Sequence, residues 1–291
     1  MQVVYHLGAH FTDEDRLLKC LLKNRDTLAH QGIVVPGPGR YRALLREARN
    51  KLRGQPAPLA LQEEMLDRIL DDTDAGRVVF SNQTFLCIPP RVLRGGRLYA
   101  DAGQKALALA QLFPQAQIEF FLAVRNPATF VPTVFHNSGE TSLETFMDGA
   151  DPRELRWSEV VRDLREANPE AEITVWSNED TPLIWGQLLA DLAGHEPQTM
   201  LDGIDDFVAS LMAPEGFKRM QAYLAGHPPE NEIQRRRVIA AFLDKYALTD
   251  EIEMELDMPG WTEDLVEDIT ELYEEDLFEI ERMPGVTFIT P

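Results

Sequence analysis

The chain has little cysteine and no long apolar segment. Its 291 residues include two cysteines, Cys20 and Cys87, and their positions offer neither a disulfide framework nor metal-ligand spacing. No apolar run approaches the roughly 18 to 20 residues that cross a bilayer, and no signal-peptide pattern precedes the first apolar stretch. These absences predict a cytoplasmic protein with reduced, buried thiols and no contact with a membrane.

Positive charge is also scarce. Lysine and arginine together number 28 against 49 aspartates and glutamates, which gives a formal net charge of -21. Nucleic acids and anionic membranes require a basic surface, so the charge argues against both as main partners. The hydrophobic share of 44% is typical of a globular protein, and the length is sufficient for one large α/β domain.

The charges are unevenly distributed along the chain. Six basic residues fall within one short stretch: Arg40, Arg42, Arg46, Arg49, Lys51 and Arg53. Residues 251–281 are densely acidic and contain no basic side chain. Both stretches can be read as solvated helix faces, or as contacts for a protein partner or for a second copy of the chain. The sequence leaves both interpretations open.

The first thirty residues have the pattern of an anion site. An apolar strand over residues 2–7 runs into Gly8-Ala9-His10-Phe11, and a helix is predicted to open at Thr12. Thr12 with Asp15 three residues later has the spacing of a capping box. A strand that turns through glycine into a helix places unpaired N–H groups and the positive end of the helix dipole at one point. Phosphate-binding loops use this arrangement.

The rest of the chain alternates between strands and helices. Apolar runs predict strands over 33–35, 77–81, 117–124 and 172–177, and helical periodicity fills the intervals between them. The helices expected are 40–53, 59–72, 101–113, 153–167 and 182–193, followed beyond residue 200 by 205–212, 214–225, 230–247 and 262–281. The alternation predicts an α/β protein with a central parallel sheet flanked by helices. We expect one domain over 1–291, with a core over about 1–200 and a helical C-terminal extension over about 201–291.

The loop after the first strand resembles that of the sulfotransferase family, whose bacterial members read roughly H-h-G-x-x-K-T-G-T-T-x-L, where h is apolar. Gly8, Thr12 and Leu17 fit this pattern, but Phe11 replaces the lysine. The acidic run Asp13-Glu14-Asp15 replaces the glycine and the hydroxyl residues that follow it. The resemblance implies a P-loop NTPase-like three-layer fold. It also implies that Gly8 and Thr12 belong to a site for the phosphosulfate end of 3′-phosphoadenosine-5′-phosphosulfate (PAPS).

A second motif supports the same resemblance. The strand over 117–124 is followed by Arg125-Asn126-Pro127, and Thr133 lies eight residues after the arginine. Sulfotransferases use the matching arginine and a serine to hold the 3′-phosphate of PAPS, so Arg125 and Thr133 are candidate cofactor-binding residues. Taken alone, Arg125 could be a salt-bridge partner and Thr133 a hydroxyl bonded to its own helix. Pro132 departs from the usual family pattern and would strain an uninterrupted helix at this point.

Candidate catalytic residues are His10 in the loop and Gln83 after the strand 77–81. Gln83 takes the place of a glutamate that is thought to activate the acceptor in many bacterial sulfotransferases, and an amide cannot accept a proton near neutral pH. His6, His10, Asp13 and Glu14 lack a recognised ligand spacing, so no metal site is predicted.

Two functions follow from the resemblance. The first is an enzyme that binds PAPS, or adenosine 3′,5′-bisphosphate as product, and transfers a sulfuryl group to a small-molecule or glycan acceptor. The second is a pseudoenzyme that keeps the fold as a binding or assembly module for a protein partner or for another copy of itself. The absent lysine and the acidic loop favour loss or weakening of catalysis, because they remove positive charge where a transferring sulfuryl group needs it.

Overall fold

The computed structural model describes residues 1–70, 75–248 and 258–291. Six strands form one sheet in which every neighbouring pair is parallel, in the order β2-β3-β1-β6-β7-β8. Their bounds are β1 Gln2–Gly8, β2 Ile33–Val34, β3 Arg77–Ser81, β6 Gln117–Val124, β7 Glu172–Ser177 and β8 Val286–Ile289. A separate antiparallel pair joins β4 Leu93–Arg94 to β5 Arg97–Leu98.

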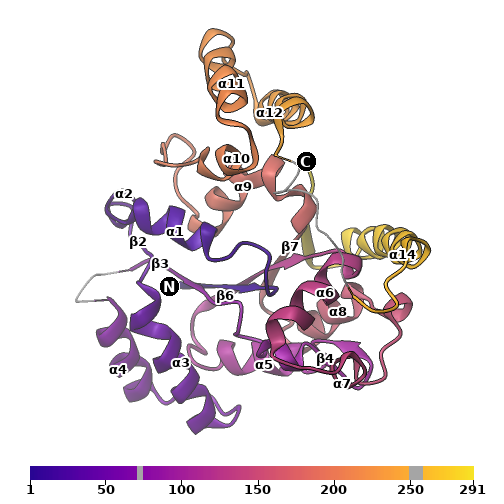
Figure 1. Ribbon diagram of the computed structural model, residues 1–291. Helices are drawn as coiled ribbons and strands as arrows, with labels where there is room; N and C mark the ends of the chain where they lie inside the picture. The colour runs from indigo at the N-terminus through magenta and orange to yellow at the C-terminus, as the bar shows by residue number, and fades with distance from the viewer. Residues whose placement is uncertain (71–74, 249–257) are drawn as a thin grey trace.

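Helices cover both faces of this sheet, which gives the three layers seen in Figure 1. One face packs against α1 Arg16–Lys23, α2 Arg25–Ala29 and α9 Thr181–Ala193. The opposite face packs against α3 Pro38–Leu52, α4 Leu59–Leu70, α5 Ala102–Ala110, α8 Trp157–Ala167 and α14 Glu263–Glu281. The central parallel sheet with flanking helices is therefore confirmed.

The side chains of the central strand β1 alternate between two hydrophobic cores, one on each face of the sheet. Val3, Tyr5 and Leu7 of β1 are buried under the face that α3 and α5 cover, whereas Val4 is buried with α1 and α9. Successive side chains of a strand point to opposite faces, so a strand covered on both sides must be apolar throughout. The predicted strands 2–7 and 117–124 belong to one parallel sheet and are direct neighbours in it, since Val3 is in register with Ile118 and Tyr5 with Phe120.

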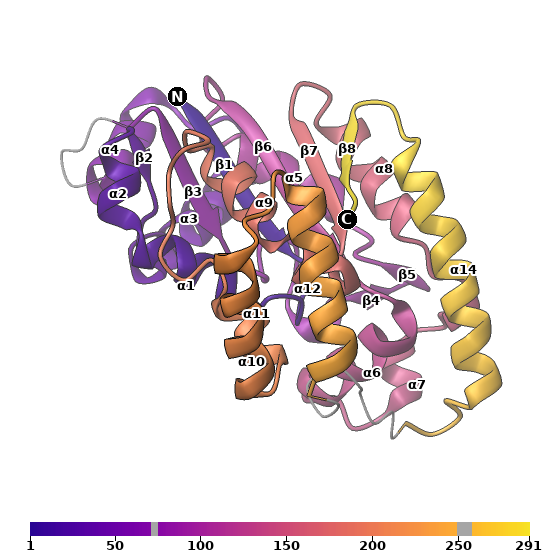
Figure 2. The ribbon, with the colours of Figure 1, turned by 90° about the horizontal axis from the view of Figure 1, so that it is seen from above.

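The described residues of the C-terminal part are mostly helical. Helices α10 Asp206–Leu211, α11 Pro214–Gly226 and α12 Glu232–Tyr246 lie outside α9 (Figures 1 and 2) and share a small apolar cluster of their own. The expectation of a purely helical extension is wrong at the end, because β8 pairs with β7 at the edge of the main sheet. Helix α4 ends at Leu70, and the predicted residues 71–72 lie outside the described residues, as do 251–257 of the acidic stretch.

A buried ion pair connects strands on either side of β1. Arg77 of β3 donates to both carboxylate oxygens of Glu119 on β6, at 2.7 and 2.6 Å, and both side chains are 9% exposed. The same guanidinium donates to the carbonyls of Asp191 and Leu192 near the end of α9. A cation at a helix C-terminus also meets the negative end of the helix dipole.

The strand order identifies where a ligand site is expected. The chain leaves β1 toward β2 at one edge of the sheet, and leaves the neighbouring β6 toward β7 in the opposite direction. In open α/β sheets ligands bind beyond the carboxyl ends of strands where the connections diverge in this way. Figure 2 shows β1 and β6 side by side. The loop after β1 and helix α6 (Pro127–Ser138) directly follow these two strands in the chain. Helix α7 (Leu143–Met147) follows α6.

Within the part of the chain that the structure describes, no helix combines the length and apolar character needed to cross a membrane.

Candidate functional site

The loop after β1 runs from Gly8 to Asp15 and passes close to the segment after β3. Gly8 has a φ of 98°, and a Cβ atom there would lie 3.2 Å from the backbone Cα of Gln83. Only glycine combines this backbone conformation with so close an approach. Phe11, Glu14 and Asp15 also have positive φ values. The loop is therefore strongly bent, and its course brings it against Gln83.

Helix α1 begins at Arg16, four residues later than predicted, and the Thr12–Asp15 capping box is wrong. Thr12 Oγ1 donates to the carbonyl of Ala9 at 2.9 Å. Asp15 precedes the helix, but its carboxylate accepts from Arg42 of α3, with distances of 2.6 and 3.3 Å. The helix start is instead capped by Asp13, whose Oδ2 accepts from the N–H of Leu17 at 3.1 Å. A carboxylate at this position matches the partial positive charge of the helix N-terminus.

Other N–H groups of the loop are also bonded to protein atoms. Gln83 Oε1 accepts from the N–H of Phe11 at 3.0 Å, and the hydroxyl of Tyr99 accepts from the N–H of His10 at 3.1 Å. The N–H of Ala9 donates to the carbonyl of Ala123 at 3.0 Å. The N–H of Leu17, which donates to Asp13, is a fourth such group. A phosphate-binding loop presents N–H donors of this kind to its ligand, whereas in this chain four of them bind protein atoms.

Arg125 and Thr133, the two candidates for a 3′-phosphate site, lie within hydrogen-bond distance of each other beyond the end of β6. Arg125 Nη2 donates to Thr133 Oγ1 at 3.3 Å, and Nε donates to Thr129 Oγ1 at 3.1 Å. Arg125 Nη1 donates to the carbonyl of Phe11 at 2.7 Å, which ties the two motifs into one site. Burial lowers the pKa of Arg125, and the nearby carboxylates of Glu179 and Glu14 oppose this change. Thr133 Oγ1 also donates to the carbonyl of Thr129 on its own helix, at 2.7 Å.

Helix α6 continues through Pro132, the residue expected to strain it. Proline has no N–H for the carbonyl four residues earlier, which is that of Ala128. Trp261, far along the chain, supplies a donor there: its Nε1 lies 2.8 Å from the Ala128 oxygen. The indole therefore compensates for the proline in the helix that carries Thr133.

Replacing Trp261 with phenylalanine is expected to destabilise the fold by about 1 to 3 kcal/mol, because the Ala128 carbonyl would lose this donor while buried. Trp185→Phe is the matched control. Trp185 is 3% exposed, and its Nε1 has no hydrogen-bond partner among the described residues, so the same substitution removes no such bond. Urea unfolding of the two variants measures the difference. Equal costs for both would show that ring volume, not the hydrogen bond, determines the effect.

The two candidate catalytic residues lie in different environments. Gln83 borders an open cavity, with its amide oxygen held by the Phe11 N–H. His10 is 0% exposed, its Nδ1 lies 2.6 Å from the Tyr99 hydroxyl, and burial lowers its pKa to about 4. An acceptor cannot reach His10 in this conformation. His6 is equally enclosed and bonds through Nδ1 to Ser81 Oγ at 2.9 Å. Among the described residues no three His, Cys, Asp or Glu side chains are grouped so as to hold a metal ion.

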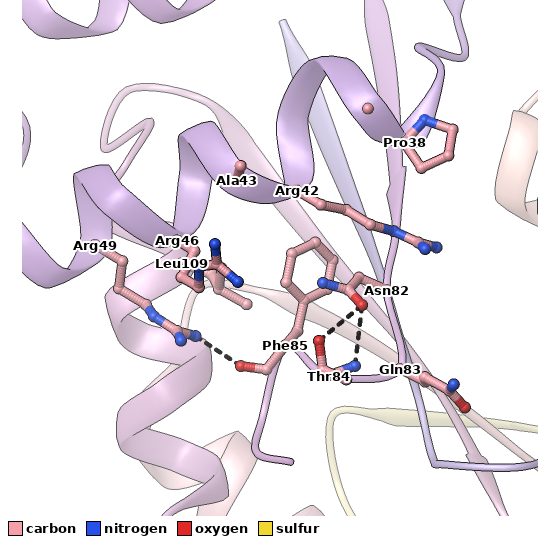
Figure 3. Close-up of a pocket in the computed structure, with 11 residues that line it drawn as sticks. Pro38, Arg42, Ala43, Arg46, Arg49, Asn82, Gln83, Thr84, Phe85 and Leu109 are labelled. Atoms are coloured by element: carbon pink, nitrogen blue, oxygen red, sulfur yellow. Dashed lines mark hydrogen bonds between the residues drawn. The ribbon is translucent and has the colours of Figure 1, made fainter.

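A cavity of about 440 Å³ lies beside this loop, between α3 and the segment 82–85 that follows β3 (Figure 3). Three arginines of α3, Arg42, Arg46 and Arg49, line it together with Asn82 and Thr84 from that segment. Sequence reasoning noted the basic stretch and the polar end of the strand but did not connect them. The available signal was the spacing of the arginines, four and three residues apart, which places them on one helix face.

Comparison of the chain with known protein families, with curated proteins and with solved structures gave no significant match. The resemblance to sulfotransferases therefore depends on the two motifs and on their placement at the carboxyl ends of β1 and β6.

Proposed function

We propose that this chain is a sulfotransferase-like protein that no longer transfers a sulfuryl group and acts instead as a binding module. The proposal rests on one hydrogen bond of the loop after β1. The Asp13 carboxylate accepts from the N–H of Leu17, at the helix start where the resemblance places the phosphosulfate of PAPS. A bound phosphate would have to displace this carboxylate or lie against it.

The charges around the loop support the same function. Phe11 stands where the family lysine would neutralise the transferring group, and it is half-buried against the apolar core. The negative charge of Asp15 is matched by Arg42, but Asp13 has no cationic partner among the ion pairs of the described residues. Two like charges about 4 Å apart repel by about 4 kcal/mol at an effective dielectric constant near 20. This repulsion disfavours a phosphosulfate beside Asp13.

An active enzyme is the second candidate, because Arg125 and Gln83 contact the loop from the ends of the two strands beside β1, and Thr133 of α6 accepts from Arg125. In that case Gly8 and Thr12 would lie at the phosphosulfate of PAPS, Arg125 and Thr133 at the 3′-phosphate, and a small-molecule or glycan acceptor beside Gln83. In the binding module, the partner is a protein or a second copy of the chain, with the basic stretch 40–53 and the acidic face of α14 as contacts.

Titration calorimetry with adenosine 3′,5′-bisphosphate and PAPS at low salt tests the proposal. We expect no binding by the wild-type chain at millimolar nucleotide. The triple variant Phe11→Lys, Asp13→Gly and Glu14→Thr should gain at least tenfold in affinity for PAPS, or about 1.4 kcal/mol, because it exchanges two negative charges for one positive charge.

Asp13→Asn is the matched control for the charge at the helix start, since an amide oxygen can still accept from the Leu17 N–H. It should give a part of the gain without exposing the helix end. Micromolar binding by the wild-type chain that Arg125→Ala abolishes would contradict the proposal and favour the enzyme.

A further inference from the structure

Arg46 and Arg49 form a pair of guanidinium groups with no carboxylate partner among the residues that the structure describes. Arg49 Nη1 donates to the carbonyl of Phe85 at 2.6 Å, and Arg46 is exposed and has no hydrogen bond or ion pair among the described residues. None of the described residues that line the cavity is acidic. In a chain with a net charge of -21, this leaves a local concentration of positive charge at one cavity.

The positive charges of Arg46 and Arg49 repel each other. Burial lowers the pKa of Arg49, and the positive charge of Arg46 lowers it further. An anion between them would relieve this repulsion and satisfy the remaining N–H donors of both forks. Guanidinium groups suit oxyanions of phosphate and sulfate type, because their paired N–H groups match two oxygens of the anion.

The other walls fit the organic part of a ligand. Phe85, Leu109 and Pro38 supply apolar surface. Asn82 Oδ1 accepts from the N–H of Thr84 at 3.1 Å and from Thr84 Oγ1 at 2.9 Å. These two bonds fix the orientation of the Asn82 side-chain amide, so its two N–H donors lie on the opposite side from Thr84. Figure 3 shows Arg46 and Arg49 at one end of the cavity and Gln83 at the other. A volume of about 440 Å³ suits a small molecule rather than a protein segment.

We propose that this cavity binds a small organic molecule that carries a phosphate or sulfate ester, with the oxyanion held by Arg46 and Arg49 and the body of the molecule between Phe85 and Asn82. The site goes beyond the proposed function, because neither arginine contacts the loop after β1. It gives the basic stretch of α3 a ligand of defined chemistry.

Calorimetric titration of the full chain with glucose 6-phosphate and glucose 6-sulfate at low salt tests the proposal. We expect saturable binding of at least one ester and none of glucose, and the stronger of the two identifies the group that the site prefers. Arg46→Ala should weaken binding at least tenfold, and it is the main variant because the side chain is exposed and bonded to nothing that the fold needs. Lys51→Ala is the matched control: it removes the same charge from the same helix, but Lys51 lies outside the cavity lining. It should change the affinity less than twofold.

Four results would overturn the proposal. Equal weakening by Lys51→Ala and Arg46→Ala would show a general charge effect rather than a site. Weakening by Arg125→Ala to the same extent as by Arg46→Ala would place the anion at the loop after β1. Tighter binding of a hexaglutamate peptide than of either ester would identify an acidic peptide as the ligand. Absence of ester binding would remove this site without affecting the nucleotide titration, which uses other ligands and other residues.

Discussion

Replacing Glu119 with glutamine is expected to lower the free energy of unfolding by about 3 to 5 kcal/mol, because the change leaves the Arg77 guanidinium buried without its counter-charge. The two side chains are 9% exposed and joined by two hydrogen bonds. Glutamine keeps the shape of the side chain, so packing contributes little to the loss. Chemical denaturation at pH 7 measures it.

Two further variants separate the charge from its surroundings. Glu172→Gln, on the neighbouring strand β7, is the control: Glu172 is exposed and accepts from Gln117, and the cost should stay within about 0.5 kcal/mol. The double variant Arg77→Met with Glu119→Leu should recover most of the stability lost by Glu119→Gln, because apolar side chains of similar size carry no desolvation cost. If the double variant is no more stable than Glu119→Gln, the bonds of Arg77 to the end of α9 matter more than the ion pair.

Most strands of the main sheet and their parallel direction could be predicted, whereas their order and this ion pair could not. Continuous apolar runs such as 117–124 have few alternatives to a buried strand, and β-α alternation favours parallel pairing. Arg77 and Glu119 stand near the beginning of their strands in the sequence, but their contact depends on β1 lying between β3 and β6. Strand β8 was missed because four residues after a long acidic helix carry little periodic signal, although all four are β-branched or aromatic.

The position of the candidate site could be predicted from the sequence, but the hydrogen bonds that hold its loop could not. Arg125 and Thr133 could be connected with the loop because the carboxyl ends of adjacent parallel strands meet at one edge of the sheet. The role of Asp13 could not be predicted, since three acidic residues compete for the helix start and Arg42, from another helix, binds one of them. The cavity was missed for a similar reason. It exists only where α3 packs beside the segment 82–85, and no local pattern records that contact.

The chain is also expected to lose stability as the pH falls from 7 to 5, and His10 should account for about 2 kcal/mol of the loss. Burial lowers the pKa of His10 in the folded state to about 4, from the ordinary histidine value of 6.5. Below pH 6.5 the unfolded chain therefore binds a proton that the folded chain does not bind until near pH 4. Throughout this window, proton binding stabilises the unfolded state relative to the folded state. The free energy of unfolding therefore decreases as the pH decreases. Burial lowers the pKa of His6 as well, which adds a change of the same sign.

Urea unfolding at pH 7 and pH 5 of the wild-type chain, His10→Asn and His227→Asn measures this contribution. Asparagine cannot titrate but can still hydrogen-bond to Tyr99, so His10→Asn should lose about 2 kcal/mol less than the wild-type chain between the two pH values. His227 is exposed at the end of α11, and His227→Asn is the matched control for the same substitution at the surface. The comparison of pH values within each variant cancels any constant cost of the substitution. An identical pH dependence for His10→Asn and the wild-type chain would mean that His10 takes up its proton in the folded state. The loop after β1 would then open to water, and an acceptor could reach His10 as the enzyme hypothesis requires.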